Sequence, residues 1–398
     1  MPLCRVPFAG ITVSPTGKMV MCCSSTHFPI GDLSEIDDLT DWFNNNPHLV
    51  EARNSMVRYK QLPHQCGSCF NWQIQDVPMT RWVKRIVPWN DEDFKNGEWP
   101  ITFLEVTASN VCNQSCVMCN SFFSSKWVNV DKKALKEGMD FRNNDRLPSG
   151  FKKYRLSDSD VDKLIGILPT IKTLVLKGGE PFADPSNMRI LEAASRLENP
   201  PFVTIVTNGA TITEPQFELL ESYRGNMDIG LSYDGIHEQY EWVRSTPFEK
   251  TVETCLRLAE IKRKKKDYVT NLTILKSLTL YTGFNLKEAS EFWLEIPEIN
   301  CVFIRPAVRP PYASLVMLPP DHLASLQSEW EKLLVNPRIE FHSTLLSLRS
   351  FSEINPIVYN DNIYNIRPWI EFMNRQRGFE IQKFVPELET FLCTLPSD

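Results

Sequence analysis

Three cysteines lie within eight residues, at Cys112, Cys116 and Cys119. Their C-x3-C-x2-C spacing lets three thiolates converge on one face of a cubane iron–sulfur cluster, which leaves the fourth iron without a protein ligand. An iron left open in this way can bind a small chelating ligand, as an open position does in other catalytic metal sites. The alternative is a zinc site completed by a distant fourth residue, although zinc sites usually use paired C-x2-C elements and no histidine lies nearby.

A second group of cysteines lies upstream of the first. Cys66 and Cys69 form a C-x2-C pair, and Cys4, Cys22 and Cys23 precede them. The N-terminal sequence MPLCRVPFAG lacks the shape of a secretory signal. Clustered cysteines in a chain without an export signal indicate metal or redox chemistry rather than a disulfide framework.

The composition is that of a soluble globular protein. Of the 398 residues, 42% are hydrophobic and 23% are charged, so the chain can bury a large core. The net charge of −6 gives no overall attraction to nucleic acid or to anionic lipid, and no apolar run is long enough to cross a bilayer. We therefore expect a cytoplasmic protein with no membrane partner and no nucleic-acid partner.

Short apolar runs rich in β-branched residues alternate with helix-capable segments from residue 101 onward. This alternation indicates parallel βαβ units. Six such units predict an α/β fold with a partial (β/α)6 TIM-type barrel of parallel strands, whose functional site lies at the carboxyl ends of the strands. The six predicted strands are 101–107, 173–176, 202–207, 229–233, 271–275 and 301–304.

A cysteine-bearing region precedes this barrel and a helical region follows it. Pro15-Thr16-Gly17 predicts a turn between two short strands, and a helical pattern runs from Leu39 to Val57. Helical patterning returns after residue 320, with helices expected around 341–351 and 367–377. We therefore divide the chain into a cysteine-rich module (1–78), a linker (79–100), the barrel (101–310) and a C-terminal helical extension (311–398).

Polar and glycine-rich motifs stand at the ends of the first four predicted strands. The first strand runs through Glu105 into the three-cysteine segment, and Lys177-Gly178-Gly179-Glu180-Pro181 follows the second. The third ends in Thr207-Asn208-Gly209, and the fourth ends in Ser232-Tyr233-Asp234-Gly235, with Arg244 soon after. Each motif alone is compatible with a plain turn or a helix cap. Four in succession, each at a strand end, indicate a ligand site to which paired glycines allow close backbone approach.

With these four elements the sequence resembles the radical S-adenosylmethionine (radical SAM) superfamily over about residues 101–306. The resemblance implies a [4Fe–4S] cluster on Cys112, Cys116 and Cys119, with S-adenosylmethionine (SAM) bound to the open iron. It places the Gly-Gly-Glu element at the SAM amino group, the serine and aspartate of the fourth strand near the ribose, and the arginine near the SAM carboxylate. The cofactor-binding residues implied in this way are Gly178, Gly179, Glu180, Asn208, Ser232, Asp234, Arg244 and Met118.

Met118 departs from the family pattern. The family usually has an aromatic residue just before the third cysteine, where it packs on adenine, and Met118 occupies that position here. A flexible thioether can stack on adenine acceptably, and Phe122 or Phe123 can supply the aromatic contact with adenine instead.

The upstream cysteines resemble the SPASM/twitch modules of radical SAM enzymes. Those modules begin with C…G-x4-C, followed by IG(N/D), a tryptophan, an arginine and C-x2-C, and this order is present between Cys4 and Cys69. The module usually follows the barrel, whereas here it precedes it. The resemblance implies a second, auxiliary [4Fe–4S] cluster, with Cys23 as an alternative to Cys22 and a zinc site as the alternative to the cluster. Its implied ligands are Cys4, Cys22, Cys66 and Cys69.

The resemblance also implies a reaction. The reduced cluster cleaves SAM to methionine and a 5′-deoxyadenosyl radical, which abstracts a hydrogen atom from a peptide or protein, or from a small molecule. SPASM and twitch relatives act largely on peptides and proteins, and a reductant such as flavodoxin or ferredoxin is the expected electron donor. Candidates for a catalytic acid or base are Tyr233, Asp234 and Glu105. The alternative function is a non-catalytic iron–sulfur or zinc-binding protein with an electron-transfer or partner role.

Overall fold

The computed structural model describes residues 4–23, 25, 28–59, 61, 63, 66, 87, 99–139, 153–342 and 344–395. The strands are β1 (Gly10–Val13), β2 (Lys18–Val20), β3 (Pro29–Asp32), β4 (Phe103–Thr107), β5 (Thr173–Lys177), β6 (Phe202–Thr207), β7 (Met227–Ser232), β8 (Thr270–Leu278), β9 (Ile299–Pro306) and β10 (Ile339–Phe341). They form one open sheet in the order β10-β9-β8-β7-β6-β5-β4-β1-β2-β3. All pairings from β4 through β10 are parallel, so the carboxyl ends of these strands meet at one edge.

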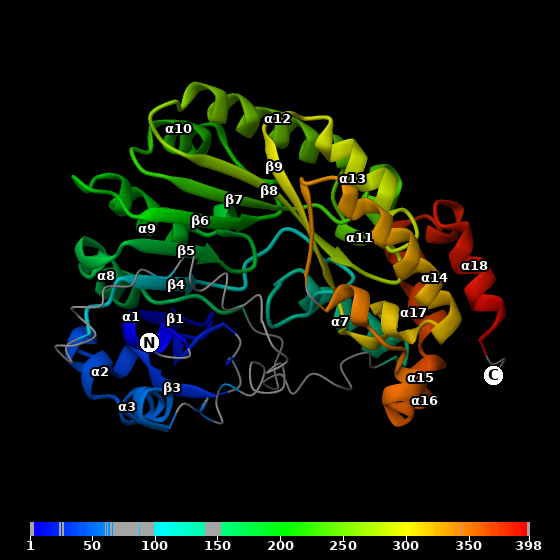
Figure 1. Ribbon diagram of the computed structural model, residues 1–398, viewed down its shortest axis with the longest axis horizontal. Coiled ribbons are helices and arrows are strands. Elements are labelled where there is room, and N and C mark those ends of the chain that lie inside the picture. The colour runs from blue at the N-terminus through cyan, green and yellow to red at the C-terminus, as the bar shows by residue number, and fades with distance from the viewer. Residues whose placement is uncertain are drawn as a thin grey trace.

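The predicted partial barrel is confirmed, and all six expected strands are present as β4 to β9. Along β8, buried side chains alternate with partly exposed ones, because successive side chains of a strand point to opposite faces. A layer of helices covers one of these faces (Figure 1). The helices of the barrel segment are α7 (Trp127–Lys136), α8 (Asp158–Gly166), α9 (Pro185–Ser195), α10 (Glu214–Ser222), α11 (His237–Arg244), α12 (Phe248–Lys264) and α13 (Leu286–Leu294).

The prediction of a helix around 341–351 is wrong. Residues 339–341 form the edge strand β10, and only a short 3-10 turn over Leu345–Ser347 follows. Pairing with β9 explains the difference, since Phe341 lies opposite Ile304 and His342 N donates to Ile304 O at 2.8 Å. Such long-range pairing overrides local helix preference.

The N-terminal module extends the sheet of the barrel. Strand β1 pairs with β4 in parallel, with Gly10 opposite Phe103, and it forms the predicted hairpin with β2. The helix expected from Leu39 to Val57 is interrupted at Asn46, whose side chain caps the next helix. The helices of this part are α1 (Val6–Ala9), α2 (Leu39–Asn45) and α3 (Pro47–Asn54), the last followed by a π turn over Ser55–Tyr59.

The glycine, tryptophan and arginine of the module's motif form its framework. A Cβ atom at Gly31 would lie 2.8 Å from the Trp42 ring, so only glycine lets the tryptophan pack there. The buried Arg53 donates hydrogen bonds to Pro7 O at 2.7 Å and to Phe43 O at 2.8 Å. Arg53 therefore ties α3 both to α1 and to the end of α2.

Replacing Arg53 with alanine is expected to destabilise the folded protein by about 3 kcal/mol, because a charged donor is lost and buried carbonyl groups are left unpaired. Burial lowers the pKa of Arg53 to about 10, so the guanidinium is still charged at neutral pH. Denaturant unfolding followed by circular dichroism measures the change. Arg58→Ala is the matched control, because Arg58 is exposed on the adjoining turn; equal losses in both variants would contradict the framework role.

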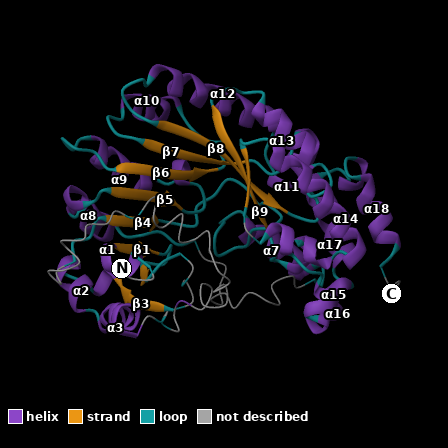
Figure 2. Cartoon of the chain, viewed as in Figure 1, coloured by secondary structure: helices purple, strands orange, loops and turns teal. Residues whose placement is uncertain are grey.

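The C-terminal extension packs at the side toward which the parallel strands point (Figure 2). The helix expected around 367–377 is confirmed as α17, and Trp369 on it stacks on Trp127 of α7 with ring centroids 5.7 Å apart. None of the helices in the described ranges is both long and apolar enough to cross a membrane. The helices of the extension are α14 (Pro320–Glu331), α15 (Phe351–Ile354), α16 (Pro356–Ile363), α17 (Ile366–Arg377) and α18 (Pro386–Cys393).

Candidate active site

The cysteine loop, residues 108–126, leaves β4 at its carboxyl end and closes onto α7. At its start, Leu156 N donates a hydrogen bond to Ala108 O at 2.9 Å. At its end, the indole nitrogen of Trp127 donates to Cys116 O at 2.9 Å. The loop is therefore held at the edge of the sheet where the sequence predicted a site.

The three thiols of this loop lie close enough to affect one another. Burial raises the pKa of each, that of Cys112 to about 12, and the neighbouring Cys116 adds to the rise at both Cys112 and Cys119. Thiols so poorly solvated do not ionise together without a cation among them, and bound iron supplies that charge and deprotonates its thiol ligands. The donor set therefore fits a cluster. Within the described ranges, no three His, Cys, Asp or Glu side chains converge to hold a single metal ion.

A buried ion pair lies beside the second cysteine. Arg244 donates to the carboxylate of Asp234, which also accepts a hydrogen bond from Ser277 N at 2.6 Å. The Nη1 atom of the same arginine is 3.5 Å from Cys116 Sγ. Asp234 and Arg244 thus bind each other, and they would have to contact the ribose and the carboxylate of SAM through their remaining hydrogen-bonding atoms.

The Gly-Gly-Glu segment after β5 is hydrogen-bonded to the cysteine loop. Gly179 N donates to Ser109 O at 3.1 Å, and Glu180 N donates to Val111 O at 2.8 Å. A Cβ atom at Gly179 would lie 2.3 Å from Val111 O, and Gly178 has a φ of 148°, which side chains rarely allow. The paired glycines therefore let two strand-end segments touch.

Glu180 joins this segment to the end of β6. Its Oε1 atom accepts a hydrogen bond from the Thr207 hydroxyl at 2.6 Å, and Oε2 accepts one from Asn208 N at 2.7 Å. Asn208 in turn donates from its side chain to Asn113 Oδ1 at 2.8 Å, next to Cys112. Burial raises the pKa of Glu180, and these donors oppose the rise. Three motifs that are far apart in the sequence therefore meet at one point.

The acid and base candidates differ in their surroundings. Tyr233 is fully buried between Trp293 and Tyr240 under the helical layer, and burial raises its pKa well above the ordinary value. The Tyr233 hydroxyl donates a hydrogen bond to Thr251 O at 3.2 Å, and its role as an acid or base stays a prediction. Glu105 is buried with its Oε1 atom 3.1 Å from Lys177 Nζ at the end of β5.

Two further predicted contacts lie on the same edge of the sheet. Ser232 is the last residue of β7 and is partly exposed. Met118 is also partly exposed, and it packs against the main core beside the third cysteine. Phe122 and Phe123, the possible substitutes for Met118, contact each other edge to face at 4.8 Å.

Three of the four predicted auxiliary ligands lie in the described residues, and Cys69 lies outside them. Cys4 and Cys22 pack against the same small apolar cluster, which includes Phe103 of β4. The Cys66 thiol is 3.9 Å from the Met21 sulfur, one residue before Cys22. Cys23, by contrast, lies within electrostatic range of Lys177 and Arg305 at the ends of β5 and β9. The packing favours Cys22 over Cys23 as the ligand.

Two protein families match the chain. The radical SAM superfamily matches residues 106–280, and an iron–sulfur cluster-binding domain, SPASM, matches residues 4–70. Residues 106–280 of the chain form a radical SAM domain. That domain implies a [4Fe–4S] cluster and SAM in the barrel, and the SPASM domain implies auxiliary iron–sulfur binding at the N-terminus. No curated protein was found to match this radical SAM protein.

Solved structures similar to this radical SAM protein include anSMEcpe with bound AdoMet and Streptococcus suis SuiB bound to the precursor peptide SuiA. The first is 18% identical, over 61% of this chain and 64% of that chain, with a TM-score of 0.40. The second is 12% identical, over 90% of this chain and 75% of that chain, with a TM-score of 0.44. The chain thus spans a little under two thirds of the length of the anSMEcpe chain.

Sequence reasoning missed the residues with which the C-terminal extension contacts the cysteine loop. Arg377, at the end of α17, donates to Ser115 O at 2.6 Å. Nothing in its sequence neighbourhood marks it, because it belongs to no motif and lies beyond the matched residues 106–280. The only available signal was its position in the last turn of a predicted helix.

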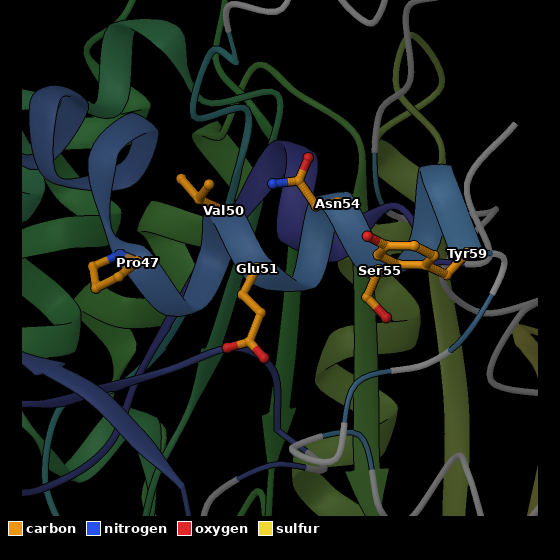
Figure 3. Close-up of a pocket in the computed structure, with 6 residues that line it drawn as sticks. All are labelled: Pro47, Val50, Glu51, Asn54, Ser55 and Tyr59. Atoms are coloured by element: carbon orange, nitrogen blue, oxygen red, sulfur yellow. The ribbon is translucent and has the colours of Figure 1, made fainter.

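A surface pocket is formed by α3 and the π turn (Figure 3). Among the described residues that line it there is no cysteine. Its lining residues are Pro47, Val50, Glu51, Asn54, Ser55 and Tyr59.

Proposed function

We propose that this protein is a radical SAM enzyme that modifies a peptide, a protein or a small molecule by hydrogen-atom abstraction. A [4Fe–4S] cluster on Cys112, Cys116 and Cys119 would supply the electron that cleaves SAM to methionine and a 5′-deoxyadenosyl radical. We propose the four N-terminal cysteines, with Cys22 rather than Cys23, as ligands of an auxiliary cluster. A peptide or protein is the first substrate class to test, because the resemblance to SPASM and twitch modules implies it.

One observation carries the proposal. Glu180 binds the end of β6 through Asn208, while its own segment binds the cysteine loop, so three motifs converge next to Cys112. A protein that only stored or passed electrons through a cluster would have no need for this convergence. The arrangement suits an enzyme that holds a ligand beside an open iron.

The residues of this edge would each hold a different part of SAM. Glu180 Oε2 accepts one hydrogen bond in the structure and has a second lone pair for the SAM ammonium group. Asn208 and Ser232 offer polar side chains at neighbouring strand ends, and Met118 lies next to the third cysteine. We propose Glu105, whose Oε1 atom lies 3.1 Å from Lys177 Nζ, as a candidate acid or base of the site.

Anaerobic reconstitution tests the proposal. We expect about eight iron atoms per chain from two clusters, and 5′-deoxyadenosine once dithionite and SAM are added. Full iron without 5′-deoxyadenosine would support the alternative of an electron-transfer or partner protein, and zinc without iron would support a zinc-binding protein. We further propose that the enzyme is cytoplasmic and that a flavodoxin or ferredoxin reduces it. Formation of 5′-deoxyadenosine with either protein in place of dithionite would support the proposed electron donor.

A further inference from the structure

The guanidinium group of Arg377 binds the backbone of the cysteine loop directly. Its Nη2 atom donates to Ser115 O at 2.6 Å, and Nη1 donates to the Ser115 hydroxyl at 3.2 Å. The remaining nitrogen, Nε, donates to Trp242 O on α11 at 2.8 Å. All three nitrogens of one side chain therefore hold the residue before Cys116 and the helix that carries Arg244.

Other contacts hold the same short stretch of the loop. At the end of α11, the hydroxyl of the C-cap residue Ser245 accepts a hydrogen bond from Ser115 N at 2.9 Å, and Val243 O accepts one from Val117 N at 3.0 Å. Trp127 of α7, which stacks on Trp369 of α17, donates a hydrogen bond from its indole nitrogen to Cys116 O. Residues 115–117 thus lie between α7, α11 and α17, and their backbone has little freedom to move.

Arg377 also brings a charge to this point. Burial lowers its pKa to about 10, which leaves the guanidinium charged at neutral pH, and Cys116 lies within its electrostatic range. In the part of the chain that the structure describes, no carboxylate forms an ion pair with Arg377. Arg244 also lies near this thiol, but Asp234 balances its charge. Arg377 therefore brings to the second cysteine a positive charge that none of the described carboxylates pairs with.

We propose that Arg377 is a positioning residue for Cys116 and raises the reduction potential of the SAM-binding cluster. The inference rests on the proposed function, because it requires a cluster on the cysteine loop. Reduction adds negative charge to a cluster, and a nearby, partly buried cation such as Arg377 stabilises the reduced form. Partners beyond the direct ligands commonly tune a metal centre in this way. The C-terminal extension is then part of the redox site rather than an appendage.

The test compares three variants of the full-length, reconstituted protein. Arg377→Gln removes the charge, and Arg377→Lys keeps the charge but loses the three-nitrogen contact. Arg375→Gln is the matched control, because Arg375 lies on the same helix, is exposed and pairs with Glu137. The readouts are iron content and the midpoint potential of the cluster whose electron paramagnetic resonance signal changes on addition of SAM.

We expect the ratio of reduced to oxidised cluster in Arg377→Gln to fall about tenfold at a fixed applied potential. For a one-electron couple this corresponds to a midpoint potential that is lower by about 59 mV. Arg377→Lys is expected to stay near the wild-type midpoint with reduced iron retention, and Arg375→Gln to match the wild type. Loss of the SAM-responsive signal in Arg377→Gln alone also supports the proposal.

Three outcomes would overturn it. The first is a wild-type midpoint in Arg377→Gln with full iron, and the second is an equal shift in Arg375→Gln. The third is loss of iron and of cooperative unfolding in both Arg377 variants, which would mean a general structural role. A wild-type protein without any SAM-responsive signal would instead reject the proposed function, so the two failures are distinguishable.

Discussion

Replacing Cys112, Cys116 and Cys119 together with alanine is expected to abolish 5′-deoxyadenosine formation and to leave about four iron atoms per chain. The activity is lost because the open iron is lost. The remaining iron would belong to the proposed N-terminal site, where Cys4 and Cys22 pack against an apolar cluster separate from the main core. Iron and sulfide analysis after anaerobic reconstitution, with chromatographic assay of SAM cleavage, measures both results.

Cys255→Ala is the control for this experiment. Cys255 is fully buried in α12 and belongs to neither cysteine group, so its removal should leave all the iron in place. A triple variant with zinc and no iron would reject the auxiliary cluster. A triple variant with undiminished iron would show that the cysteine loop binds none.

Gly179→Ala is expected to lower the rate of 5′-deoxyadenosine formation by about 100-fold or more. The added methyl group would lie 2.3 Å from Val111 O and 2.6 Å from the Val111 carbonyl carbon. Backbone atoms cannot give way as a flexible side chain does, so the segment before Cys112 must move. A displacement of about 1 Å at a reacting centre is enough to cost a factor of about 100.

Gly166→Ala provides the comparison, because Gly166 ends α8 and a Cβ atom there would meet nothing within 4 Å. We expect that variant to keep wild-type activity and iron content. Turnover with SAM and dithionite, normalised to iron per chain, separates a misplaced cluster from an absent one. Wild-type turnover in Gly179→Ala would show that the cysteine loop does not depend on this contact.

The barrel could be predicted from the sequence because the patterns that mark its strands and motifs each lie within a few consecutive residues. Each strand from β4 to β9 appears as a short β-branched run, and each motif follows directly after such a run. Once the strands are parallel, their carboxyl ends must share an edge, so the meeting of Glu180 with Asn208 follows from topology. The C-x3-C-x2-C spacing likewise identifies a cluster loop without any knowledge of its neighbours.

The features that the sequence did not predict depend on contacts between residues that are far apart in the chain. The edge strand β10 forms through hydrogen bonds to β9, so residues 341–351 resembled a helix only in isolation. Tyr233 stands in a motif just after β7, yet its side chain is fully buried against Trp293 and Tyr240, which are contacts that the motif does not predict. Arg377 shares no spacing with the cysteine loop, and only the packing of α17 on α7 brings it there.

Strand β4 connects the two cysteine groups physically. Phe103 at its amino end packs in the cluster that Cys4 and Cys22 touch, and the chain passes from Thr107 directly into the loop with Cys112. The four residue steps between Phe103 and Thr107 span about 13 Å. Hydrogen bonds to β1 on one side and to β5 on the other hold this strand in a fixed position. An electron passing between the two proposed iron centres would cross a region of continuous β-sheet rather than a hinge between separate domains.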